Sequence, residues 1–226
     1  MAAFFEPPPL PEDEEPEDLS QPEWMGPPRN ILGAAVPIRL VLARTDEVAV
    51  AVADATAYPT GFELRLVTRA RTTDYGSGDD PFDPATMWRM RHPPGRGELP
   101  PEFLRFGLEF ADRTKATNLG GFPDPEKDPG ARVLMQGSGG GGGGSWETQY
   151  WCWPLPPEGP LAFVCEWPAK GIALTRAEVD ARIVLDAAAR AEVLWDDPGP
   201  GAGDARSNFL TFGSARRTPP STPPRR

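Results

Sequence analysis

Few side chains in this sequence are of the kind that bind metals or transfer protons, and none falls at a diagnostic spacing. Asp74, Asp79, Asp80 and Asp83 lie within one loop, and clustered carboxylates of this kind can hold Ca²⁺. Their spacing is not that of an EF-hand loop, so we interpret the segment as a solvated acidic loop. His92, the single histidine, lies among arginines and prolines, and we interpret it as exposed rather than as an acid–base catalyst.

The sequence predicts no catalytic residue, no metal site and no cofactor. One histidine and two cysteines are too few for a zinc site with several such ligands. The Gly-x-Ser-x-Gly motif of serine hydrolases is absent, and neither cysteine has the sequence context of a nucleophile. A carboxylate-dependent enzyme is kept as an alternative, in which Glu109 with Asp112 or Glu166 would face one pocket.

Six consecutive glycines, Gly139 to Gly144, resemble the loops that cradle phosphate. Such loops need a helix N-terminus behind them to orient backbone amides at the anion. Here the run is followed by Ser145, Trp146 and a predicted strand. We therefore interpret it as a flexible hairpin loop.

The aromatic strands near residues 150 and 165 are the best candidates for binding. A hairpin centred near residues 158–159 would place Cys152 opposite Cys165, and we expect these thiols to be near neighbours and reduced. Trp151 and Trp153 would then share a face with Glu166. That face is either covered by the C-terminal helix or open as a platform for a sugar, a peptide or a partner. These three residues are the predicted ligand-binding residues.

The elements around these residues predict an antiparallel β-sandwich. Leu104, Phe106, Leu108 and Phe110 alternate with polar or small residues, which is the period of a half-buried strand. About eight strands are predicted, over residues 36–42, 48–58, 62–71, 103–111, 115–119, 133–135, 146–153 and 161–167. Residues 72–101 show no such period, and a loop of this length is usually functional or disordered.

The last element changes period. Ile183, Ala187, Ala191 and Leu194 fall at helical spacings, so a helix is predicted over about residues 180–194. The preceding residues 172–179 alternate and predict a last strand. Thr175 to Glu178 also fits a capping box, which would start the helix earlier.

The two ends of the chain differ in composition from its middle. Residues 1–28 hold eight acidic side chains, no Lys or Arg and many prolines, and residues 199–226 are rich in Gly, Pro, Ser and Arg. Such segments bury too little apolar surface to offset the entropy of ordering them. We therefore predict disordered tails over 1–28 and 199–226, and a single domain over 29–198 with a C-terminal helix.

The net charge and the lack of visible targeting signals limit the classes of partner that we expect. The chain carries a net charge of −10, and its middle part remains acidic, which argues against general nucleic-acid binding. No signal peptide is visible, and no segment approaches the ~18 apolar residues that span a bilayer. Two cysteines fit a reducing compartment. We expect a cytoplasmic protein that binds neither membranes nor nucleic acid and whose partner is another protein.

Four strings, LVLARTDEVAVAV, AYPTGFELRL, WCWPLPPEGPLAFVCEWPAKGI and DAAARAEVLW, resemble a family of uncharacterised proteins from high-GC Gram-positive bacteria. The resemblance covers roughly residues 32–195. It implies a bacterial origin and a single folded domain. The family has no assigned activity, so the resemblance implies no catalytic residue.

The function predicted from these observations is a non-enzymatic binding or structural module that acts through protein contacts. The reason is that no set of nucleophile, base and oxyanion donors is present. The first alternative is a carbohydrate- or small-ligand-binding sandwich that uses the aromatic face of Trp151 and Trp153. The second alternative is the carboxylate-dependent enzyme.

Overall fold

Two antiparallel sheets make up most of the fold, and a computed structural model describes them over residues 22–71, 99–119, 128 and 130–196. The described residues belong to one compact unit, Pro22–Asp197. Most of the predicted N-terminal tail, the C-terminal tail, the four loop aspartates and His92 lie outside the described residues.

The larger sheet has six strands in the order β2-β4-β5-β9-β8, with β3 also paired to β4. Its strands are β2 (Ala34–Val36), β3 (Leu40–Arg44), β4 (Val48–Ala57), β5 (Phe62–Ala70), β8 (Val133–Gly142) and β9 (Ser145–Trp153). Every pairing within it is antiparallel. β2 and β3 together form one edge of this sheet, and β8 forms the other.

The smaller sheet has four strands in the order β11-β10-β6-β7. Its strands are β6 (Arg105–Glu109), β7 (Lys115–Thr117), β10 (Pro160–Trp167) and β11 (Ile172–Asp180). A two-stranded ribbon pairs β1 (Ile31–Leu32) with β12 (Glu192–Val193). Three short helices complete the described chain: η1 (Glu23–Met25), η2 (Pro168–Lys170) and α2 (Arg182–Ala188).

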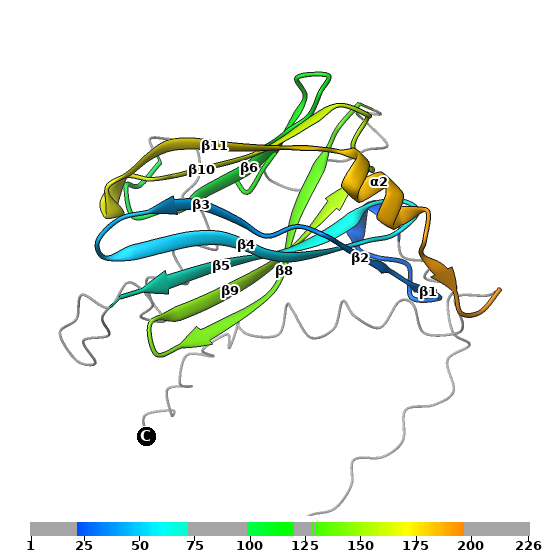
Figure 1. Cartoon of the computed structure of the whole chain (residues 1–226), viewed down its shortest axis with the longest axis horizontal. Coiled ribbons are helices and arrows are strands. Elements are labelled where there is room, and N and C mark those ends of the chain that lie inside the picture. The colour runs from blue at the N-terminus through cyan, green and yellow to red at the C-terminus, as the bar shows by residue number, and fades with distance from the viewer. Residues whose placement is uncertain (1–21, 72–98, 120–127, 129, 197–226) are drawn as a thin grey trace, which may run out of the picture. The chain divides into compact units, whose positions relative to one another are not determined.

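The core lies between the two sheets, which Figure 1 shows as separate layers. The rings of Phe106 on β6 and Tyr150 on β9 meet across it at 5.4 Å between centroids. The predicted fold class, a mainly β protein with antiparallel sheets and one C-terminal α-helix, is therefore confirmed. The alternation of apolar and polar residues was sufficient to predict this fold class, because one face of each sheet is buried.

The phase of alternation changes once within β4. Val48, Val50 and Val52 are buried, but further along the strand Ala55 and Ala57 are the buried residues. The register with β5 shifts between Val52 and Asp54, which marks a β-bulge. The extra residue returns the apolar side chains to the core after the bulge.

The single first strand predicted over residues 36–42 is wrong, because Pro37 divides it. β2 ends at Val36 and β3 begins at Leu40, and both pair with β4. Proline has no amide hydrogen to donate to a ladder, so the strand is interrupted at this point.

The hairpin predicted at the glycine run is present, but its loop is much shorter than predicted. β8 continues through Gly142, and only Gly143 and Gly144 form the turn, with φ values of 61° and 77°. Positive φ at both central residues is the requirement of a type I′ turn, and glycine meets it without strain.

The predicted hairpin between the two cysteine-bearing strands is wrong. β9 and β10 belong to different sheets, so Cys152 pairs with Phe62 and Leu134, whereas Cys165 pairs with Phe106 and Thr175. The connection over residues 154–159 crosses from one sheet to the other. Both cysteines are buried free thiols, and burial raises the pKa of each.

The predicted order of a last strand followed by a helix is confirmed, but the extent of the helix is wrong. α2 ends at Ala188, and the chain then enters β12. The capping-box residues lie within β11 instead of starting a helix. Ala187 is buried as predicted, whereas Leu194 is 46% exposed, because the helix ends before its stripe would reach that residue.

Candidate functional site

Trp151, a predicted ligand-binding residue, lies on the outer face of the larger sheet, the face turned away from the smaller sheet. It is only 4% exposed. Its indole Nε1 donates a hydrogen bond to the Glu23 carbonyl in η1 at 3.1 Å, and Tyr58 meets its ring edge-on at 5.8 Å between centroids. A Cβ at Gly61 would lie 2.7 Å from the indole. η1, and not the C-terminal helix, therefore covers Trp151.

Trp153 and Glu166 do not form one site with Trp151. Trp153 shares the outer face and is half-buried. Glu166 lies on β10 in the smaller sheet, where its carboxylate pairs with Arg105. The three predicted ligand-binding residues are separated because their grouping depended on the incorrect hairpin between β9 and β10.

Glu63 and Tyr58 form a half-buried polar pair beside Trp151 that sequence reasoning missed. The Tyr58 hydroxyl donates to Glu63 Oε2 at 3.3 Å. Burial raises the pKa of Glu63, and the hydrogen bond from Tyr58 partly opposes this shift. The pKa of Tyr58 is raised to about 12, mainly by burial and to a smaller extent by the charge of Glu63. The feature that would have revealed Glu63 as a neighbour of Trp151 is the strand register, which sets these two residues opposite each other.

The carboxylates considered for an enzyme are engaged by other polar groups. Arg113 pairs with Glu109 at 3.1 Å, and its hydrogen bond is the main reason that the pKa of Glu109 is lowered. Asp112 accepts hydrogen bonds from Thr114 and from Arg132, which lower its pKa to about 2. Both carboxylates are therefore ionised at neutral pH, and neither has the raised pKa of a general acid.

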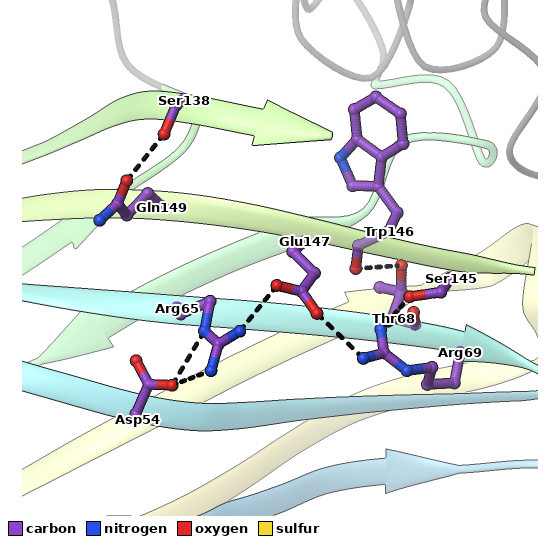
Figure 2. A network of polar contacts seen from close by, with 9 residues as sticks. All are labelled: Asp54, Arg65, Thr68, Arg69, Ser138, Ser145, Trp146, Glu147 and Gln149. Carbon is purple, nitrogen blue, oxygen red and sulfur yellow. Dashed lines mark hydrogen bonds and ion pairs between the residues drawn. The ribbon is translucent and has the colours of Figure 1, made fainter. Parts of the chain in front are cut away.

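A chain of alternating charges crosses the outer face at the end of the sheet away from Trp151, which we call the open end (Figure 2). Arg65 bridges Asp54 on β4 and Glu147 on β9, and its Nη1 lies 2.7 Å from Glu147 Oε2. Arg69 pairs with the other Glu147 oxygen at 3.0 Å and also donates to Ser145. Hydrogen bonds from Arg65 and Arg69 lower the pKa of Glu147.

Beside this chain of charges lies the glycine edge, by which we mean Gly139–Gly142 on β8. Every residue of the glycine edge is exposed. β8 pairs with β9 on one side, and among the described residues no strand pairs with it on the other. The glycine edge is therefore an accessible sheet margin without side chains.

The direction of the backbone groups along the glycine edge follows from one hydrogen bond. The amide of Ala70 donates to the Gly144 carbonyl at 2.6 Å, so the backbone of Gly144 faces β5. Backbone directions alternate along antiparallel strands. Ser145, the next residue, therefore faces β8, and its partner Gly142 turns its amide and carbonyl towards β9. By the same alternation along β8, Gly139 and Gly141 turn theirs outward.

The other sheet edges carry features that discourage pairing with another chain. β7 is three residues long and carries Lys115. The edge made by β2 and β3 is interrupted at Pro37, and α2 packs against β2. β11 displays alternating charges, among them Arg176 and Glu178. Short strands, prolines and charges protect natural sheet edges, and the glycine edge has none of them.

The two sides of the glycine edge differ in free space. A Cβ at Gly141 would lie 2.0 Å from the Ser145 carbonyl oxygen, and one at Gly139 would lie 3.0 Å from a carbonyl oxygen of β9. At Gly140 and Gly142 nothing lies within 4 Å of an added Cβ. Since their cross-strand partners lie on the outer face, these two glycines open onto that face.

Comparisons of the chain with family models, with curated proteins and with solved structures find no match in any of the three. Within the described ranges, no three His, Cys, Asp or Glu side chains gather as a metal site requires. Of the helices that the structure describes, none is long and apolar enough to cross a membrane. The glycine edge and the charges beside it are therefore the candidate site on geometry alone.

Proposed function

We propose that this protein is a non-enzymatic binding module that accepts an extended segment of a protein partner along the glycine edge. The observation that carries the proposal is the pair of outward amide and carbonyl groups at Gly139 and Gly141 on an exposed edge. In such β-augmentation, main-chain hydrogen bonds supply affinity, and side chains beside the added strand supply specificity.

The lack of side chains suits an incoming strand. Glycine costs roughly 0.5–1 kcal/mol relative to alanine in a strand interior, because it loses more backbone entropy on folding. A partner strand that completes the ladder offsets this cost, and no side chain obstructs its approach.

The alternatives have less support from the geometry. A sugar or small-ligand platform would use exposed aromatic rings, but Trp151 is 4% exposed and hydrogen-bonded to Glu23. A carboxylate-dependent enzyme would use an acid with a raised pKa facing a second carboxylate. Glu109 and Asp112 instead have lowered pKa values.

The test is a selection of peptides from a random displayed library on the full-length protein, followed by affinity measurements on two variants. Gly139→Pro removes the outward amide hydrogen, and proline is tolerated on an edge strand at such a position. Gly139→Ala is the matched control, because it adds the same Cβ and keeps the amide hydrogen.

We expect selected peptides to bind Gly139→Pro about fivefold or more weakly than Gly139→Ala, since one hydrogen bond contributes on the order of 1 kcal/mol. Hydrogen exchange at the amides of Gly139 and Gly141 should slow when peptide is bound. Equal binding to both variants, or the absence of any selected peptide, would overturn the proposal.

A further inference from the structure

The register of the larger sheet aligns two arginines with the glycine edge. One cross-strand row on the outer face runs Arg44, Ala49, Arg69, Ser145, Gly142. The Arg69 guanidinium reaches across to donate to the Ser145 hydroxyl, and its side chain is 49% exposed. Since Ala49, Ser145 and Gly142 carry no charge, Arg69 is the charged group of this row that lies nearest to Gly142 along the register.

The next row has a different character. It runs Val41, Ala51, Val67, Glu147, Gly140, and its one charge, on Glu147, is already neutralised by Arg65 and Arg69. The space over Gly140 is open on the outer face. A flat apolar side chain fits there, since aromatic rings pack well over strand glycines and against guanidinium groups.

The inner side of the glycine edge already has an aromatic neighbour. The Trp146 indole nitrogen would lie 3.6 Å from a Cβ at Gly139. Trp146 Nε1 is held in place by a hydrogen bond to the Thr148 hydroxyl at 3.1 Å. The inner side is thus supplied with a ring by the chain itself, whereas the outer side is not.

We propose that the segment bound at the glycine edge carries an aromatic residue and a carboxylate two positions apart, the ring over Gly140 and the carboxylate over Gly142 beside Arg69. Residues two apart point to the same face of a strand, and Gly140 and Gly142 have this spacing. The inference rests on the proposed function, because it names the class of peptide that the same edge accepts.

A second copy of this chain fits the edge less well. Two glycine edges paired with each other would leave the spaces over Gly140 and Gly142 empty on both sides. Residues 138–142 are exposed, and a strand of this length spans only about 17 Å. Stable interfaces bury about 1,600 Å² in total, which one short strand pair does not approach. The net charge of −10 on each copy adds repulsion.

The test uses end-blocked peptides of seven residues and the full-length protein. The probe is Thr-Ser-Tyr-Thr-Glu-Thr-Ser. The first control peptide places Tyr and Glu next to each other, so that they point to opposite faces. The second control replaces Glu by Lys, and the third replaces Tyr by Ala. Affinity is measured by titration calorimetry at low salt, because exposed charge pairs are screened by salt.

We expect the probe to bind about tenfold more tightly than each control, a difference within the range that charge pairs and aromatic packing supply. Arg69→Gln should remove the preference for Glu over Lys while keeping the preference for Tyr over Ala. Gly140→Thr, which fills the space under the ring, should have the reverse effect. Gly139→Pro should weaken all four peptides, and Gly139→Ala should not.

The outcomes separate the two proposals. Equal affinity for all four peptides, with Gly139→Pro still weakening them, overturns the aromatic–carboxylate preference and leaves the edge-binding function standing. Binding that is insensitive to Gly139→Pro, or no binding at about 1 mM peptide, which corresponds to about 4 kcal/mol, overturns both. Self-association that Gly139→Pro abolishes in analytical ultracentrifugation identifies a second copy as the occupant and overturns the inference.

Discussion

The outer face of the larger sheet is closed at one end and open at the other, and a glycine marks each end. At the closed end, the Trp151 indole and the Cys152 carbonyl occupy the space where a side chain at Gly61 would lie. At the open end, nothing occupies the equivalent space at Gly142. The same residue type therefore serves internal packing in one place and leaves a vacant strip of surface in the other.

This difference shows that residue type alone does not tell which part of a sheet face is buried and which is exposed. Aromatic residues are the usual first choice for a binding surface, and for this reason Trp151 was predicted from the sequence to bind a ligand. Its ring is nevertheless used internally, between η1 and Tyr58. The exposed glycine edge, by contrast, has no side chains at all.

The largest expected effect is at the closed end. Trp151→Ala should reduce the free energy of unfolding by about 3–5 kcal/mol, the usual range for removing a buried tryptophan. Trp195→Ala is the matched control, because Trp195 is 63% exposed, and its effect should stay within about 0.5 kcal/mol. Urea unfolding of both variants measures the difference. Similar losses in the two variants would show that Trp151 is not a packed residue.

The two glycines provide the next comparison. Gly61→Ala places a Cβ 2.4 Å from the Cys152 carbonyl oxygen, so it should destabilise the fold by about 1–3 kcal/mol. Gly142→Ala meets no atom and should be neutral or stabilising by about 0.4–1 kcal/mol, since alanine restricts the unfolded chain. The reverse order of stabilities in urea unfolding would contradict the distinction between the two ends.

The pH dependence of stability should have opposite signs at the two ends. The raised pKa of Glu63 means that its contribution is fully present below the unfolded value of about 4.3 and is lost as pH rises through its folded pKa. The lowered pKa of Glu147 gives a contribution that is present above about 4.3 and is lost as pH falls through its folded pKa.

Relative to the wild type, Glu63→Gln should therefore gain stability as pH rises from 3 to 8, whereas Glu147→Gln should lose it. Urea unfolding across that range measures both trends. Parallel trends for the two variants would mean that both carboxylates have the same environment.

The smallest effect on stability is expected at the open end. Arg69→Gln removes an ion pair in which the arginine side chain is 49% exposed, and exposed pairs contribute about 0–1 kcal/mol. Because Arg65 still holds Glu147, the loss should lie at the low end of that range. A thermal unfolding scan measures it. A loss similar to that of Trp151→Ala would show that the charges are structural.

Much of the strand content follows from the sequence because alternation is a local property. Leu104, Phe106, Leu108 and Phe110 were predicted to share a face, and Phe106, Leu108 and Phe110 are buried in the core. Pairing between strands is not local. The proline-rich connection at 154–159 is equally compatible with a hairpin and with a crossing between sheets, since both would bury Cys152 and Cys165.

The candidate site was harder to predict than the fold. Glycine contributes no hydrophobic period, so β8 could be recognised only as far as Met135, and its extension is fixed by the register with β9. The covering of Trp151 depends on Glu23, which lies 128 positions earlier in the chain. The single histidine, predicted to be exposed, lies outside the described residues.

The ribbon of β1 and β12 determines how the fold responds to mechanical tension. Asn30 donates to the Trp195 carbonyl at 3.1 Å, and the Leu194 amide donates to the Asn30 carbonyl at 2.7 Å. A pull applied at residues 30 and 195 loads both strands from the same end. The two residue pairs of the ribbon then separate one after the other, as in unzipping, because a two-stranded ribbon is only marginally stable alone. Modest tension should therefore open the ribbon while both sheets, and with them the glycine edge, stay folded.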